Sequence, residues 1–170
     1  MAIMDELAAG YVLQPGAGRT IPAPFARSEL TMKAEGHQTG GHITVYESRQ
    51  EPYSVGPARH YHDRLTELFY VVEGEITFLI GAEVHQALTG ATVVIPPGTV
   101  HAFRNATREP ARLLILVLPG GFEGFFDEAQ TQSSPMSDAE SWQLLNERWD
   151  VHVVGRPLAD EIGKPKEASP

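Results

Sequence analysis

The spacing of hydrophobic and polar residues changes near residue 120. Between residues 30 and 118, apolar residues, many of them β-branched or aromatic, form short runs separated by glycine and proline. Such runs are typical of β-strands joined by turns. We expect a hairpin around Gly74 and strands at 42–46, 67–72, 75–80, 83–88, 92–95, 101–106 and 111–118. Many short strands with closely spaced turns favour a sandwich or barrel, an all-β fold.

Beyond residue 120 the pattern becomes helical. Phe122, Phe125 and Phe126 stand at i, i+3 and i+4, which places three rings on one face of a helix. A second helix is predicted to begin at Ser137, because Ser137 and Glu140 have the spacing of a capping box. The apolar residues of its inner face are Trp142, Leu145 and Trp149. We expect these aromatic residues to pack against the sheet rather than to bind a cofactor.

The 170 residues are within the size range of a single domain. We expect one domain over 1–170, with a barrel at about 28–118. An arm at 1–27, rich in glycine and proline, precedes it, and a helical extension at 120–156 follows. The tail at 157–170 mixes charge with proline, and we expect it to be poorly ordered.

Composition narrows the possible partners. The net charge of -9 argues against a nucleic-acid backbone and against an anionic membrane surface as partners. No cysteine is present, so disulfides and thiolate chemistry are excluded. The first ten residues lack the basic and long apolar regions of a secretory signal, and the longest aliphatic run, 113–118, is too short to span a bilayer. We therefore expect a soluble cytoplasmic protein.

Candidate chemistry is concentrated in two stretches punctuated by glycine and proline. The first reads Gly56-x3-His60-x-His62-x4-Glu67-x6-Gly74, and the second reads Gly90-x5-Pro96-x-Gly98-x2-His101-x3-Asn105. Alternate residues of a strand share a face, so His60 and His62 can enter one cavity while Tyr61 points away. Glu67 follows a bend. His101 comes from a distant strand, and its approach is set by the turn before it.

Singly, each of these residues is weak evidence for a site, because most histidines and glutamates on strands serve structure or solvation. Together, imidazole and carboxylate are the usual ligands of a divalent first-row transition metal. His37, His42, His85 and His152 fall in no comparable pattern, and we expect them to be structural or exposed.

The two stretches resemble the two signature motifs of the cupin superfamily. The second matches at every defining position, and the first departs only at Gly56, which lies two residues closer to His60 than usual. The resemblance implies a double-stranded β-helix, a six- to eight-stranded cupin jelly-roll barrel, here with short C-terminal helices. It also implies one divalent transition metal ion, Fe, Mn, Ni, Co, Cu or Zn. The implied ligands are His60, His62, Glu67 and His101.

Such a ligand set leaves coordination positions open for a substrate oxygen or O2, and Glu67 is placed to act as a general base. If strand alternation holds, Phe69, Val71 and Phe103 line an apolar pocket for a small molecule. Residues 119–127 resemble a stretch of single-domain bacterial cupins similar to quercetin 2,3-dioxygenases.

The leading hypothesis is therefore a quercetinase-like, metal-dependent dioxygenase that acts on a small aromatic or enolic substrate with O2. Two alternatives stay open: a non-redox cupin isomerase or polyketide cyclase, and a small-molecule-binding or sensory cupin without catalysis. The resemblance also implies a homodimer.

Overall fold

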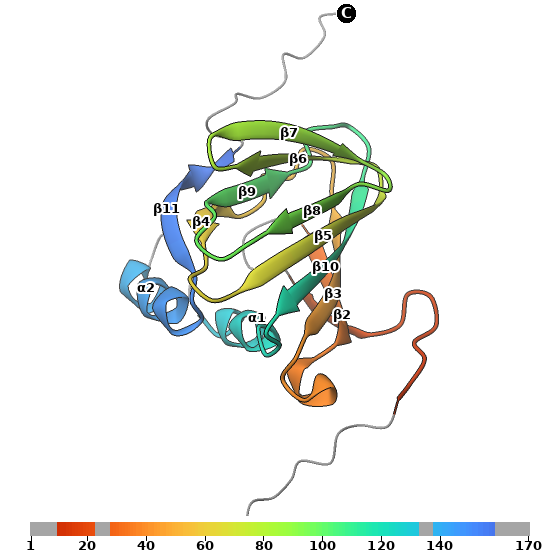
Figure 1. Ribbon diagram of the computed structural model, residues 1–170, viewed down its shortest axis with the longest axis vertical. Coiled ribbons are helices and arrows are strands. Elements are labelled where there is room, and N and C mark those ends of the chain that lie inside the picture. The colour runs from red at the N-terminus through yellow and green to blue at the C-terminus, as the bar shows by residue number, and fades with distance from the viewer. Residues whose placement is uncertain (1–9, 23–27, 133–137, 159–170) are drawn as a thin grey trace, which may run out of the picture.

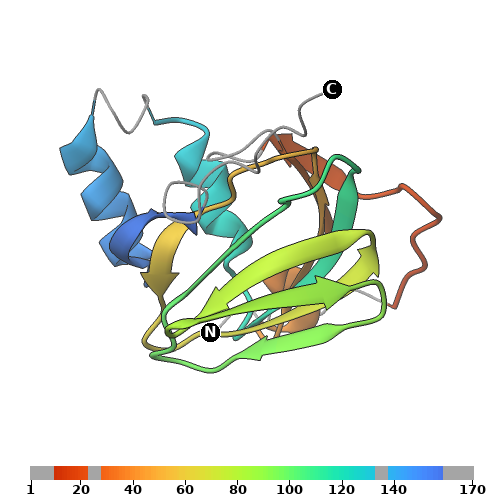
Figure 2. The same cartoon turned by 90° about the horizontal axis from the view of Figure 1, so that it is seen from above.

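A computed structural model describes residues 10–22, 28–132 and 138–158, in which two antiparallel sheets face each other. The larger sheet has six strands, in the order β1 (Arg19–Pro22), β2 (Ser28–Ala34), β3 (Thr44–Gln50), β10 (Ala111–Leu118), β5 (Thr66–Glu73) and β8 (Thr92–Ile95). The smaller sheet has five, in the order β11 (His152–Pro157), β4 (Ala58–Tyr61), β9 (His101–Arg104), β6 (Glu75–Ile80) and β7 (Glu83–Leu88). Figures 1 and 2 show the two sheets curving around a common interior.

Strand β10 shows how the sequence builds this interior. Its side chains alternate, and Leu113, Ile115 and Val117 are at most 1% exposed. The strand pairs with β3 on one side and β5 on the other, so it lies in the middle of the larger sheet. Period-two alternation is the pattern of a strand with one buried face.

The chain changes sheets at Gly74, and the predicted hairpin there is wrong. Strand β5 pairs with β10 and β8, whereas β6 pairs with β7 and β9. Gly74 has a φ of 81°, and a Cβ there would lie 2.8 Å from the carbonyl oxygen of Pro110. The glycine marks a tight turn, as its type predicts, but the choice of partner strands belongs to the tertiary fold. The hairpin lies one strand later, between β6 and β7.

Two helices and a last strand follow the barrel. Helix α1 (Glu123–Ala129) and helix α2 (Ala139–Arg148) contact each other on the same side of the molecule as β4 and β11 (Figures 1 and 2). The N-cap of α2 is Asp138, which accepts a hydrogen bond from the backbone N–H of Ser141. The predicted cap, Ser137, lies outside the described residues. A Cβ at Gly124 would meet the ring of Trp149, so the glycine allows the two helices to approach closely.

Strand β11 lies largely within the segment for which the sequence predicted only helices. Its side chains are mostly half-buried or exposed, without a clean alternation, and it pairs with β4 antiparallel. Most of the predicted tail, 159–170, lies outside the described residues. In the described part of the chain, no helix has the length and apolarity needed to cross a membrane.

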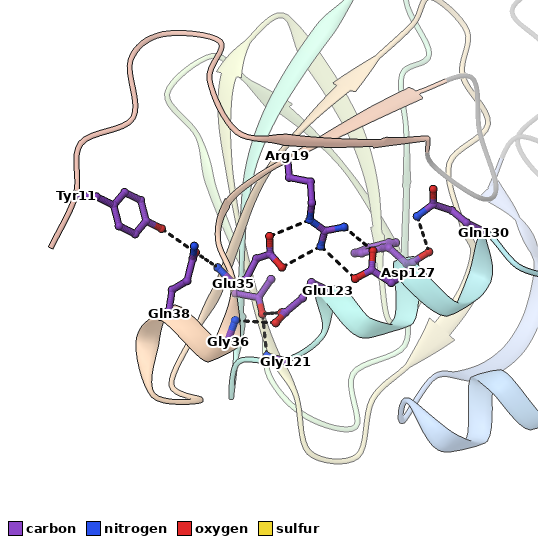
Figure 3. A network of polar contacts seen from close by, with 11 residues as sticks. Tyr11, Arg19, Glu35, Gly36, Gln38, Gly121, Glu123, Asp127 and Gln130 are labelled. Carbon is purple, nitrogen blue, oxygen red and sulfur yellow. Dashed lines mark hydrogen bonds and ion pairs between the residues drawn. The ribbon is translucent and has the colours of Figure 1, made fainter. Parts of the chain in front are cut away.

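A polar network joins the N-terminal strand to α1 (Figure 3). The Arg19 guanidinium on β1 donates to both carboxylate oxygens of Glu35 at 2.9 Å and to Asp127 of α1 at 2.6 and 3.1 Å. Beneath it, Glu123 accepts from the backbone N–H of Gly36 in the 3-10 helix η1 (Gly36–Thr39) at 2.7 Å. Its other oxygen accepts from the Thr44 hydroxyl at 2.5 Å. These bonds hold α1 against the barrel.

Candidate metal centre

The structure brings His60, His62, Glu67 and His101 together. Their ligand atoms all lie within 4.8 Å of one another, although the residues come from β4, the turn after it, β5 and β9. All four side chains are buried, and His101 is 0% exposed. His60 and His101 are register partners across β4 and β9. The predicted clustering of the four residues is therefore present.

The side chains of residues 60–62 alternate between the two faces of the chain, as the sequence predicted. His60 and His62 point inward, with ring centroids 5.0 Å apart. Tyr61 points away and stacks on His152 at 4.7 Å. The Pro-Pro-Gly turn before β9 is tied back to this strand, because the N–H of Gly98 donates to the carbonyl oxygen of His62 at 2.7 Å.

Each imidazole is oriented by a backbone carbonyl. Nδ1 of His60 lies 2.8 Å from the carbonyl oxygen of Ala58, Nδ1 of His101 lies 3.0 Å from that of Thr99, and Nδ1 of His62 lies 2.6 Å from that of Asp150. A carbonyl oxygen only accepts, so Nδ1 carries the proton in all three rings. In a neutral ring Nε2 then has a lone pair, and the three lone pairs belong to the atoms that face the cluster.

With the three rings neutral, the cluster consequently contains acceptors without donors. Nε2 of His101 lies 2.7 Å, and Nε2 of His62 3.5 Å, from Oε2 of Glu67. Across the described residues, none of these three atoms has a hydrogen-bond partner. Buried polar atoms without partners are costly and call for an explanation. A cation among them would satisfy all three at once.

Electrostatics in the cluster are dominated by burial and by mutual proximity. Burial, together with the neighbouring His101, lowers the pKa of His60 to about 3. Burial alone would raise the pKa of Glu67, but the contacts with His101 and His62 outweigh it and hold that pKa below its usual range. Burial alone would lower the pKa of His62, and the Glu67 carboxylate reverses this into a rise. At neutral pH a negative carboxylate thus faces a neutral His60.

Three imidazole nitrogens and a carboxylate oxygen suit a divalent first-row transition metal. The donor set, the fixed tautomers and the unpartnered buried atoms all fit such an ion. The cluster therefore fits a metal site as in cupins, and the donor types are compatible with Fe, Mn, Ni, Co, Cu and Zn alike.

Asp150, in the segment after α2, orients His62 through a hydrogen bond. Asp150 supplies the carbonyl that orients the ring, and its carboxylate accepts from the backbone N–H groups of Asp63 at 3.1 Å and Arg64 at 2.8 Å. These bonds lower the pKa of Asp150 against the opposing effect of burial. Outer contacts of this kind set the tautomer and orientation of ligand histidines. Sequence reasoning missed this role, because Asp150 lies 88 residues from His62.

An apolar cavity of about 130 Å³ opens beside the cluster and reaches His60 and Glu67. Phe103 lines it, as predicted, but Phe69 and Val71 do not; both are in the packed core, at most 1% exposed. They share the inward face of β5 with Glu67, so alternation is correct. The cavity lies at the Glu67 end of that face. Alternation does not specify which part of a face borders a cavity.

Other segments complete the walls of the cavity. From α1 and its N-cap come the rings of Phe122, Phe125 and Phe126, which were expected only to pack against the sheet and which do both. From β3 come three side chains of its inward face, and from the C-terminal segment come Asn146, Val151 and Val153. The cavity-lining residues of β3 are Tyr46, Ser48 and Gln50. Their i, i+2, i+4 spacing within the predicted barrel was the available signal.

Comparison with known proteins agrees with this arrangement. The family model for the Cupin domain matches residues 47–117. Quercetin 2,3-dioxygenase of Bacillus subtilis (strain 168) is 31% identical over 129 residues, which are 74% of this chain and 37% of that protein. The chain thus spans little more than a third of the length of this curated relative.

Two solved structures share the fold. A predicted oxalate decarboxylase from Thermotoga maritima has a TM-score of 0.59 at 14% identity, covering 64% of this chain and 99% of that one. The polyketide cyclase RemF from Streptomyces resistomycificus has a TM-score of 0.58 at 16% identity, covering 65% and 80%. The protein is thus a two-sheet antiparallel jelly-roll barrel with a histidine–glutamate cluster inside. It belongs to the cupin superfamily, with the cupin match at residues 47–117, so the predicted fold class is confirmed.

Proposed function

We propose that the protein is a metal-dependent cupin enzyme, a quercetinase-like dioxygenase that uses O2 on a small aromatic or enolic substrate. In this proposal His60, His62, Glu67 and His101 hold one divalent transition metal ion. The observation that carries the proposal is the set of buried, unpartnered ligand atoms beside an apolar cavity. When bound, the ion supplies Lewis acidity and open positions for a substrate oxygen and O2.

Glu67 is the proposed general base. Its carboxylate is 5% exposed and lines the cavity, so it faces both the cluster and the bound molecule. A pKa below the usual range keeps it deprotonated at neutral pH and also makes it a weak base. It therefore takes a proton only from an acidic hydroxyl, such as an enol or phenol whose oxygen is close to the cation. The proton moves from that hydroxyl to a carboxylate oxygen of Glu67.

The cavity favours a small substrate. Its volume of about 130 Å³ is close to that of an engineered 150 Å³ cavity that takes up benzene, and below the several hundred Å³ of pockets for larger ligands. One aromatic ring or a short enol matches this space better than the three rings of quercetin. The likeness to quercetin 2,3-dioxygenase supports the reaction class, and the volume of the cavity favours a small substrate.

The same residues would serve a non-redox isomerase or cyclase, in which the carboxylate moves a proton and oxygen takes no part. A binding or sensory role needs the cavity alone. Oxygen dependence distinguishes the dioxygenase from the non-redox enzymes. Glu67→Gln distinguishes catalysis from binding, because it keeps the shape of the side chain and removes the base; the metal content of the variant is compared with wild type, since the change also removes a charged ligand. We also propose a homodimer, which light scattering tests.

The experiment begins with protein purified without a histidine tag and analysed for bound metals. Each of the six ions is then loaded in turn, and oxygen uptake is measured with single-ring catechols and enols and with quercetin. We expect uptake with at least one ion and one single-ring substrate, and at least a tenfold loss in Glu67→Gln. A protein without affinity for any of these ions would remove the basis of the proposal. Turnover that proceeds equally without oxygen would favour the non-redox class.

A further inference from the structure

Strand β3 presents polar side chains to a cavity that is otherwise largely apolar. Tyr46, Ser48 and Gln50 are inward-facing neighbours at alternate positions, and they are 4%, 1% and 2% exposed. All three line the cavity next to the histidine–glutamate cluster. Buried polar groups are normally paired, so their partners show which of them are available to a ligand.

A directed chain of hydrogen bonds runs along this face. The Ser54 hydroxyl donates to Oε1 of Gln50 at 3.0 Å, and Nε2 of Gln50 donates to Oγ of Ser48 at 2.6 Å. Ser48 therefore acts as an acceptor in this chain and keeps its own hydroxyl hydrogen. Within the described residues, no acceptor receives that hydrogen. Ser48 is thus a buried donor at the cavity wall.

Tyr46 is the second donor. Its ring packs edge-on against Phe126 at 5.3 Å, which fixes its position. Across the part of the chain that the structure describes, the phenol hydroxyl has no hydrogen-bond partner. Burial, reinforced by the charge of Glu67, raises the pKa of Tyr46 well above 10. The phenol keeps its proton at neutral pH and is available to donate.

We propose that Tyr46 and Ser48 form a donor pair that binds an oxygen acceptor on a single-ring aromatic ligand. This inference rests on the proposed function only in taking the cavity as the ligand site. The ring of the ligand packs among Phe103 and the phenylalanines of α1, which form the apolar walls. The ligand class is then an aromatic molecule with a carbonyl or similar oxygen directed at β3. The pair sets specificity, because a ligand without that oxygen leaves two buried donors unpaired.

Two probes of equal shape test the pair: acetophenone, which carries a carbonyl oxygen, and α-methylstyrene, which has a CH2 group in its place. Binding to the full-length, metal-free protein is followed under nitrogen by shifts of its backbone amide signals in NMR. We expect wild type to prefer acetophenone. Tyr46→Phe should weaken acetophenone binding roughly five- to tenfold and leave α-methylstyrene within about twofold. Ser48→Ala should act in the same direction, and it also removes the acceptor of the Gln50 amide.

Tyr70→Phe is the matched control, since Tyr70 is 41% exposed on β5 and lies outside the cavity. Thermal unfolding of each variant checks its fold. Equal effects on both probes, no effect on either, or a wild type that binds neither would overturn the donor pair. Binding of the probes needs neither metal nor oxygen. Absence of turnover would therefore contradict the proposed reaction without affecting the result of this binding test.

Discussion

Two buried glutamates in this protein make opposite use of similar surroundings. Glu67 and Glu123 are 5% and 8% exposed, and each lies in a group of histidine and acidic residues close enough to hold an ion. Glu123 has a donor on each oxygen, the backbone N–H of Gly36 and the Thr44 hydroxyl. Oε2 of Glu67 faces the Nε2 atoms of His62 and His101, and among the described residues it has no hydrogen-bond partner.

The difference lies in hydrogen-bond saturation. By distance alone, each of the two groups could hold an ion. So could a third group among the described residues, formed by Asp63, Asp150 and His152. In the Glu123 group, backbone and hydroxyl donors already satisfy the charge, and Arg19 pairs with Glu35 (Figure 3). In the Glu67 group each Nδ1 proton is donated to a backbone carbonyl, so that in the neutral rings the Nε2 lone pairs face a carboxylate. The first arrangement is complete as it stands, and the second calls for a cation.

The largest expected effect is the loss of metal in His101→Ala. This change removes the fully buried imidazole that we propose as a ligand, which lies 2.7 Å from Glu67. Loss of an outer contact of a metal ligand typically costs 10- to 100-fold in metal affinity, so we expect loss of the ligand itself to cost more than about 100-fold. Metal analysis and competition with a chelator measure it. His85→Ala, at a half-exposed histidine on β7, should leave the metal content unchanged. Equal metal content in the two variants would place the ion elsewhere.

Glu123→Ala should give the second largest effect, on stability alone. It leaves the N–H of Gly36 and the hydroxyl of Thr44 without their acceptor, which we expect to lower the free energy of unfolding by about 3 kcal/mol. Urea denaturation measures the loss. Metal content should match wild type. A loss of metal in this variant would show that the two groups are coupled.

A control in the same network is Arg19→Gln. Arg19 is 42% exposed in its pairs with Glu35 and Asp127, and we expect a change within about 1 kcal/mol, smaller at high salt. A larger cost for Arg19→Gln than for Glu123→Ala would contradict the ranking of buried above exposed contacts.

The smallest effect concerns pH. The pKa of His60 is lowered to about 3 in the fold, from an ordinary value of 6.5. Below pH 6.5 the unfolded chain binds a proton that the folded chain refuses, so His60 makes the metal-free protein less stable as pH falls toward 3. The slope is at most about 1.4 kcal/mol per pH unit. The raised pKa of His62 acts in the opposite direction, so the net slope of wild type is smaller.

Comparison with His60→Asn isolates the contribution of His60. Between pH 6.5 and 5.5, metal-free wild type should lose about 1 kcal/mol relative to the variant, as measured by urea denaturation. Identical pH slopes for the two proteins would mean that His60 is as free to take a proton in the fold as in water.

Strand parity, a local rule, predicted that His60 and His62 share one face, and the resemblance to the cupin motifs added Glu67 and His101 to the cluster. His60 and His62 share a face for the same reason that Tyr61 leaves it, and Gly98 turns the chain toward His101 as its type suggests. The same rule placed Phe69 and Val71 on the inward face of β5 but not at the cavity. Alternation specifies a face and is silent on which part of that face stays open.

The sequence did not predict which distant segments pair with each other. The turn at Gly74 was recognised, yet its two strands separate into different sheets. Strand β11 lacks a regular alternation and exists because β4 offers an edge beside it. Both outcomes depend on which segments meet, and no local pattern records that.

By itself, then, the sequence determined the kinds of ligand atom and the strand faces that carry them, since both follow from residue type and from a period of two. Only the tertiary structure decided which buried groups keep a free donor or acceptor. Two of the bonds that decide this join residues far apart in the chain: Asp150 to His62 over 88 residues, and Glu123 to Gly36 over 87. The Nδ1 atoms of His60 and His101 instead bond to carbonyls only two residues away. The bonds to Glu123 satisfy both of its carboxylate oxygens. The bonds to the imidazole Nδ1 atoms take up the ring protons, so that Glu67 faces the Nε2 lone pairs of neutral rings.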